Sequence, residues 1–208
     1  MAKVLVLNSS ILGSDSASRE IVDHALKILA GRDLALEIRS RDLGAEPIPH
    51  LSTANWAGVR GTPSSAVEQA TRALSDTLLD ELRAADMLLI GAPMYNFSIP
   101  TGLRSWFDHV LRAGETFRYG ENGPRGLLSG KRVIVVESRG GMYSQGPAQA
   151  MDFQEPYLRQ LLGFMGLSDV QFVRVERLGS GGDARATALA GAKSQIEALL
   201  ADSLAKVA

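Results

Sequence analysis

The chain has 208 residues, of which 45% are hydrophobic and 22% charged, with a formal net charge of −1. This size and composition suit one domain with a full hydrophobic core, spanning residues 1–208. The near-neutral charge gives no electrostatic reason to expect nucleic acid or an anionic membrane as a partner. The lack of cysteine excludes disulfides, thiol nucleophiles and cysteine-ligated metals. With no apolar stretch of about 20 residues and no signal-peptide pattern, we expect a cytoplasmic protein.

Apolar runs and helical spacings of apolar residues alternate along the whole chain. In order, they predict a strand at 4–7, a helix from Ser16 to Gly31, a strand at 34–38, a loop at 43–62, a helix that starts at Pro63, a strand at 87–91, a helix within 99–111, a loop at 113–131, a strand at 133–136, a helix within 153–165, a strand at 170–175 and a closing helix within 189–204. Such alternation is typical of an α/β fold with a doubly wound parallel sheet. Five strands suit the flavodoxin-like order 2-1-3-4-5, with helices on both faces.

The strand at 87–91 leads into the segment Pro-Met-Tyr-Asn-Phe at residues 93–97, which we call the ring loop. Backbone N–H groups and the Asn96 side chain can hydrogen-bond a planar polar ring there, while Met94 and the aromatic residues cover it. Open α/β sheets bind their ligands at this carboxyl edge. The alternative is a turn with only a packing role, although such turns more often carry Gly, Ser or Asp.

Residues 9–18, the serine loop, follow the first strand and contain five serines. Their hydroxyls and the free N–H groups at the start of the next helix predict a phosphate site. The alternative is an ordinary helix N-cap beside a solvated loop. The loop does not end in Gly-Lys-Ser/Thr, so it is not a nucleotide-binding P-loop.

Residues 138–141, Ser-Arg-Gly-Gly, follow the fourth strand and form the glycine loop. Two glycines let the backbone approach a ligand and donate N–H groups to negative charge that builds on a ring. Alone, the pair would indicate only a tight turn. In the predicted strand order, all three loops meet at one crevice.

The remaining motifs give weaker evidence for a functional site. The glycines at 179–182 only weakly match a dinucleotide fingerprint, and no later strand offers a ribose-binding acid, so a strand-to-helix turn with Asp183 as N-cap is the simpler interpretation. The three histidines, His24, His50 and His109, form no metal-binding or catalytic spacing. No bound metal is expected.

Together these residues resemble the bacterial FMN-dependent NADH azoreductases, flavodoxin-like relatives of the quinone reductases, nearly end to end. The resemblance is carried by residues 4–12, 92–97, 116–119 with 121–124, and 137–141. It implies an FMN site made of phosphate contacts at Ser10, Ser16, Ala17 and Ser18, a ring segment at Pro93, Met94, Tyr95, Asn96 and Phe97, and a pyrimidine-end loop at Ser138, Arg139, Gly140 and Gly141. It also implies a homodimer in which Trp56, Phe117, Tyr119 and Phe164 are candidate pocket walls.

The resemblance implies an enzyme in which NADH reduces bound FMN and leaves, and the flavin then reduces a quinone or an azo compound. NADPH stays open as an alternative donor. Because the flavin supplies the chemistry, no catalytic acid or base is expected from the protein. The competing interpretation is a flavodoxin-type electron carrier serving a protein partner, but such carriers are usually acidic. A flavin-free binding module is a third.

Overall fold

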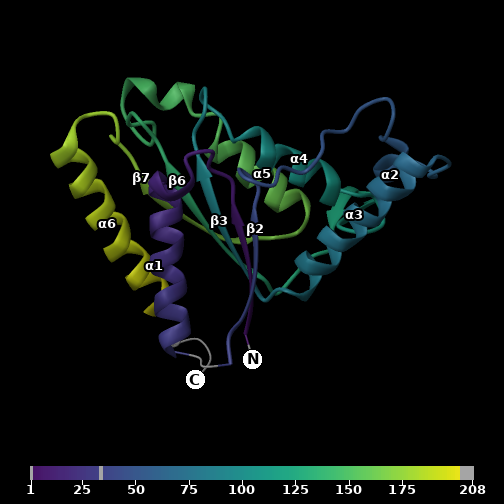
Figure 1. Ribbon diagram of the computed structural model, residues 1–208, viewed down its shortest axis with the longest axis horizontal. Helices are drawn as coiled ribbons and strands as arrows, with labels where there is room; N and C mark the ends of the chain where they lie inside the picture. The colour runs from purple at the N-terminus through teal and green to yellow at the C-terminus, as the bar shows by residue number, and fades with distance from the viewer. Residues whose placement is uncertain (1, 33–34, 202–208) are drawn as a thin grey trace.

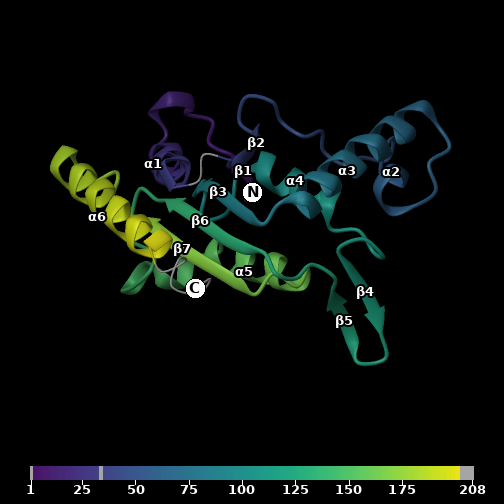
Figure 2. The same ribbon diagram turned by 90° about the horizontal axis from the view of Figure 1, so that it is seen from below.

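The computed structural model describes residues 2–32 and 35–201 (Figure 1). Its main sheet has five parallel strands in the order β2-β1-β3-β6-β7. These strands are β1 (Lys3–Asn8), β2 (Glu37–Asp42), β3 (Met87–Pro93), β6 (Arg132–Ser138) and β7 (Asp169–Val175). The order agrees with the predicted 2-1-3-4-5, because β4 (Phe117–Gly120) and β5 (Gly123–Gly126) form a separate antiparallel hairpin within the predicted loop at 113–131. Figure 2 shows this hairpin projecting from the body of the protein.

Helices pack on both faces of the sheet (Figures 1 and 2). One face is covered by α1 (Ala17–Arg32) and α6 (Gly182–Ala201), and the other by α3 (Ala66–Ala84), α4 (Thr101–Val110) and α5 (Glu155–Phe164). The shorter elements are α2 (Ala57–Arg60) and the 3-10 turns η1 (Gly13–Asp15) and η2 (Pro147–Met151). None of the helices in the described part of the chain combines the length and apolarity needed to cross a membrane.

The period of two along each strand divides the core into two layers. In β1, Val4 and Val6 pack toward α1 and α6, whereas Leu5 and Leu7 pack toward α3 and α4. All four side chains are buried. A central strand buried on both faces is apolar throughout, which is why the runs in β1, β3 and β6 were recognisable.

The second strand lies later than predicted. We expected it at residues 34–38, of which Leu34 lies outside the described residues, but β2 runs from Glu37 to Asp42. It is an edge strand whose first four residues are exposed, so it has no buried apolar run. The charged side chains along β2 discourage this exposed edge from pairing with a strand of another molecule.

Two helix boundaries also differ from the prediction. The first helix continues through Gly31 to Arg32. The helix expected to start at Pro63 begins at Ala66, because Ser65 and Glu68 form a capping box that satisfies the first N–H groups.

The boundaries of the last two helices also differ from the prediction. Phe153 precedes α5 and is exposed. Asp183 lies in the first turn of α6 and not at its N-cap. The described part of α6 ends at Ala201, so Leu204 of the predicted closing helix lies outside the described residues.

Candidate functional site

Two side-by-side contacts join the three predicted loops at the carboxyl edge of the sheet. The Tyr95 hydroxyl accepts a hydrogen bond from the N–H of Ile11 at 3.1 Å and lies 3.3 Å from Ser10 Oγ. The ring loop therefore contacts the serine loop. On its other side, the N–H of Met94 donates to the carbonyl of Ser138 at 2.8 Å, which joins it to the glycine loop. Three segments far apart in sequence thus form one continuous rim.

The serine loop ends in buried hydroxyls at the start of α1. Ser16 and Ser18 are 2% and 1% exposed, and their Oγ atoms lie 3.1 Å apart with the small Ala17 between them. Ser16 Oγ also accepts the N–H of Arg19 at 3.2 Å, so it caps the helix. The N–H groups and dipole of a 16-residue helix favour an anion here. The Arg19 side chain is paired with Asp42, so the cradle consists of neutral donors.

A buried acceptor without a partner lies beside this cradle. Asn8 Oδ1, at the end of β1, has no hydrogen-bond partner among the described residues. A Cβ at Gly91 would lie 3.0 Å from that oxygen and 3.6 Å from Ser18 Oγ, so glycine keeps the space open. Such an acceptor fits the polyhydroxyl ribityl chain of FMN, which links a phosphate to a ring. The residues at this edge therefore fit the cofactor.

The ring loop is a tight reversal of the chain. Tyr95 and Ser98 exchange both backbone hydrogen bonds, at 3.0 and 3.1 Å. Between them Asn96 and Phe97 have φ values of 47° and 72°, in the left-handed region that non-glycine residues rarely adopt. Both side chains are exposed at the tip. Such strain in non-glycine residues clusters at ligand sites.

The backbone of the glycine loop is held by the start of the next connection. The carbonyls of Arg139, Gly140 and Gly141 accept from Leu178, Gly179 and Arg177, respectively, at 2.9–3.1 Å. The N–H groups of Gly140 and Gly141, by contrast, meet no acceptor within the described ranges. Two fixed N–H donors are therefore available for the oxygen or nitrogen of a ring.

The Arg139 side chain is not free to bind a ligand, since it is fully buried beneath the loop. Its Nη2 donates to Glu137 at 2.7 Å and lies 3.0 Å from Asp152, its Nη1 contacts Glu176 at 3.2 Å, and its Nε donates to Gln154 at 3.0 Å. The guanidinium thus ties the ends of β6 and β7 to the segment before α5. Its place under the predicted pyrimidine-end loop is structural support.

Glu137 is the least solvated carboxyl group of this network. Burial raises its pKa to about 8, helped by the nearby carboxylates of Glu155 and Asp152 and opposed by Arg139. Its Oε1 has no hydrogen-bond partner among the described residues. A neutral carboxyl therefore lies one residue before the glycine loop at neutral pH.

Glu176 is the counterpart that stays ionised. Burial alone would raise its pKa, but the Ser144 hydroxyl and the N–H groups of Tyr143 and Ser144 donate to it and lower the pKa below its usual range. This carboxylate therefore holds the chain that follows the glycine loop directly, and it holds the glycine loop itself through Arg139. The sequence patterns predict no role for Glu137, Asp152, Gln154 or Glu176. The one available signal was a lone carboxylate in the apolar run of β6.

Three of the predicted pocket-wall aromatics lie together, but away from this edge. Phe117 is centred 4.6 Å from Phe164 and 5.5 Å from Tyr119. Phe164 ends α5, immediately before the turn at Gly166 that leads to the amino end of β7, and Gly126 of the hairpin packs against that turn. Within this chain, the structure therefore places this cluster at the opposite edge of the sheet. Tyr119 is 74% exposed on the projecting hairpin.

Trp56 lies neither at the carboxyl edge nor in the cluster of Phe117, Tyr119 and Phe164. It is 50% exposed, at the start of α2, which packs on α3.

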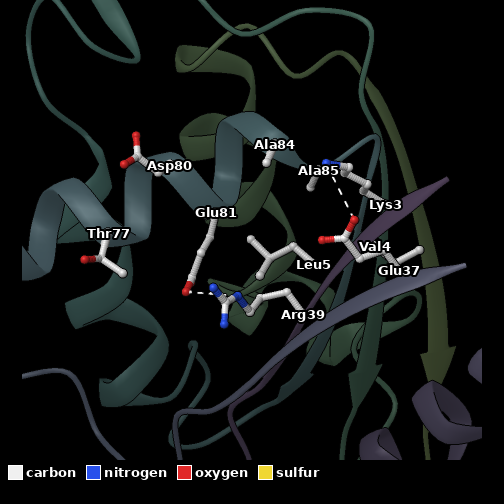
Figure 3. A pocket seen from close by; sticks show the side chains of 10 residues that line it. All are labelled: Lys3, Val4, Leu5, Glu37, Arg39, Thr77, Asp80, Glu81, Ala84 and Ala85. Atoms are coloured by element: carbon white, nitrogen blue, oxygen red, sulfur yellow. Dashed lines mark ion pairs between the residues drawn. The ribbon is translucent and has the colours of Figure 1, made fainter. Parts of the chain in front are cut away.

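Elsewhere, a cavity of about 370 Å³ opens between α3 and the amino ends of β1 and β2 (Figure 3). Four of its charged side chains form two ion pairs, Lys3 with Glu37 and Arg39 with Glu81. Within the described residues, no group of His, Asp and Glu side chains is arranged to hold a metal ion.

A parallel sheet in this order, with the serine loop after β1, the ring loop after β3 and the glycine loop after β6 at its carboxyl edge, is typical of a flavodoxin-like protein. A sequence model of the family with the flavodoxin-like fold matches residues 2–200, and the chain belongs to this family. It is 60% identical over 196 residues to an FMN-dependent NADH:quinone oxidoreductase of Hyphomonas neptunium, covering 94% of each chain.

A second relative of the same name, from Ralstonia nicotianae, is 49% identical over 206 residues, which cover 98% of this chain and 99% of the relative. Among solved structures, an azoreductase from Bacillus anthracis matches with a TM-score of 0.87 at 25% identity, covering 96% of this chain and 98% of that one. The resemblance to FMN-dependent azoreductases and quinone reductases is confirmed.

Proposed function

We propose that this chain is an FMN-dependent oxidoreductase that uses NADH to reduce quinones and azo compounds in a ping-pong, two-electron mechanism. The observation that carries the proposal is the continuous rim, in which Tyr95 contacts the serine loop and Met94 contacts the glycine loop. The relatives named NADH:quinone oxidoreductase and azoreductase support the same activity.

The predicted cofactor residues divide by chemistry along the rim. Ser10, Ser16, Ala17 and Ser18 would hold the phosphate, the segment from Pro93 to Phe97 would lie along the ring, and Ser138, Gly140 and Gly141 would meet its pyrimidine end. Arg139 would support that loop from below. When bound, FMN would supply the redox chemistry, accepting a hydride from NADH and passing two electrons to the acceptor. The protein would orient the ring and place the N–H groups of Gly140 and Gly141 where they favour negative charge.

A homodimer completes the proposed site. Phe117, Tyr119 and Phe164 lie at the far edge of their own sheet, so these aromatics could form a pocket wall only over the site of a second copy. The exposed Tyr119 on its projecting hairpin suits that role. The strands β1, β3, β6 and β7 contribute to two continuous core layers, which supports one domain over residues 1–208. Trp56 as a wall residue, NADH over NADPH and a cytoplasmic location stay predictions.

The activity is tested with the purified protein and excess FMN. We expect yellow protein after removal of free flavin, loss of the visible flavin absorption when NADH is added without oxygen, and parallel double-reciprocal lines when NADH and a quinone are varied. Intersecting lines would count against the ping-pong mechanism. If the flavin is bound but NADH bleaches it only with a protein partner present, the electron carrier is correct. Protein that neither turns yellow nor melts at a higher temperature with FMN would be a flavin-free module.

The Asn96 side chain offers a direct test of the ring loop. Asn96→Ala should weaken FMN binding by about 1–2 kcal/mol, roughly tenfold in dissociation constant, through one lost hydrogen bond. Because Asn96 has a φ of 47°, alanine also adds backbone strain, whereas Asn96→Gly removes the side chain without it. Fluorescence titration should therefore show weaker binding in both variants. If only Asn96→Ala binds FMN less well, strain and not the amide explains the loss.

A further inference from the structure

The segment between η2 and α5 reaches both loops proposed to hold the flavin ring. Figure 1 shows η2 (green) above the carboxyl ends of β6 and β7. From its end, the N–H of Phe153 donates to the carbonyl of Phe97 at 3.1 Å, at the tip of the ring loop. The next residue, Gln154, has no exposed surface.

Both ends of the Gln154 amide are used, one on each side. Its Nε2 donates to the carbonyl of Ala92 at 2.9 Å, directly before the ring loop. Its Oε1 accepts from Nε of Arg139 at 3.0 Å, in the glycine loop.

Asp152 fixes the position from which Gln154 acts. Its Oδ1 accepts the N–H groups of Gln154 and Glu155, at 2.9 and 3.1 Å, and so caps α5. Its Oδ2 lies 3.0 Å from Arg139. A buried network of hydrogen-bonded polar groups restricts the geometry of the segments that it joins.

We propose that Gln154 is a positioning residue for the flavin: its amide sets the spacing between the ring loop and the glycine loop by holding Ala92 and Arg139 at once. It touches neither cofactor nor substrate. The inference rests on the proposed function, because it assumes that the two loops hold a flavin. An amide is required, since one end must donate to a carbonyl while the other accepts from a guanidinium.

Two variants separate the two hydrogen bonds. Gln154→Met keeps a side chain of similar length and loses both bonds, whereas Gln154→Glu keeps an acceptor for Arg139 but, when ionised, cannot donate to Ala92. Gln160→Met, on the exposed face of α5, is the matched control. Each protein is prepared as FMN-loaded holoenzyme. The dissociation constant of FMN and the midpoint potential of the bound flavin are measured near pH 8, and the melting temperature is recorded.

We expect both Gln154 variants to bind oxidised FMN about tenfold more weakly than the unaltered protein. The reduced flavin should lose about a further tenfold, because the N–H groups of Gly140 and Gly141 would be displaced from the charge that it carries. For a two-electron couple that difference lowers the midpoint potential by about 30 mV. A merely structural role would lower the melting temperature without changing the potential.

The inference is overturned if either folded variant matches the unaltered protein within about twofold in FMN affinity and has the same potential. Should Gln154→Met fail to fold, Gln154→Glu decides, because it retains the bond to Arg139. If the unaltered protein itself does not bind FMN, the proposed function fails with it, and this outcome is distinct from the first.

Discussion

Arg139→Leu should destabilise the protein by about 3–5 kcal/mol, the cost of removing one partner from a buried ionic network. The substitution leaves the carboxylates of Asp152 and Glu176 and the amide oxygen of Gln154 without their buried donor. Neutral Glu137 limits the loss, since a protonated carboxyl needs no counterion. Urea denaturation of the protein without FMN measures the free energy of unfolding. The remaining folded protein should also release FMN more readily, because the glycine loop loses its support.

The matched control is Arg159→Leu, which removes an arginine that also pairs with a carboxylate of the network, Glu155, but has a half-exposed side chain. An exposed pair contributes about 0–1 kcal/mol, so this variant should stay close to the unaltered protein. Equal, small effects of the two substitutions would contradict the assignment of Arg139 as the centre of the network.

The fold could be predicted where burial leaves a local pattern. The strands β1, β3 and β6 each contain a continuous apolar run because helices cover them on both faces, and the amphipathic helices between them show apolar residues at helical spacing. The edge strand β2 has no such pattern, so the sequence predicts a strand at the apolar residues before it. The strand from Gly123 to Gly126 holds two glycines and a proline, so the sequence predicts a loop where the structure has the hairpin of β4 and β5.

The candidate site, too, could be predicted only where it leaves a local pattern in the sequence. Its loops could be found because sheet order and strand ends determine which segments meet, and their small and aromatic residues are visible in sequence. Side-chain direction could not be read in this way. Arg139 lies in the glycine loop, yet its guanidinium points into the protein toward Asp152 and Gln154, which follow it by 13 and 15 residues. Such contacts depend on how β6 and α5 pack, and no local spacing encodes them.

Glu137→Gln should change the pH dependence of stability more than stability itself. Burial raises the pKa of Glu137 from 4.5 to about 8, so between these values the folded chain holds a proton that the unfolded chain has released. Its contribution to the free energy of unfolding therefore falls as pH rises through this window, by up to about 1.4 kcal/mol per pH unit. Glutamine is neutral at every pH and keeps an oxygen for Arg139.

We therefore expect Glu137→Gln and the unaltered protein to unfold with free energies within about 1 kcal/mol of each other near pH 5, and the variant to be more stable by a few kcal/mol near pH 9. Glu121→Gln, on the exposed hairpin tip, controls for the loss of one surface charge and should leave the pH profile unchanged. Denaturation curves across the pH range measure all three proteins. A constant difference between Glu137→Gln and the unaltered protein at every pH would mean that Glu137 is already ionised in the folded state and that the attraction of Arg139 outweighs its burial.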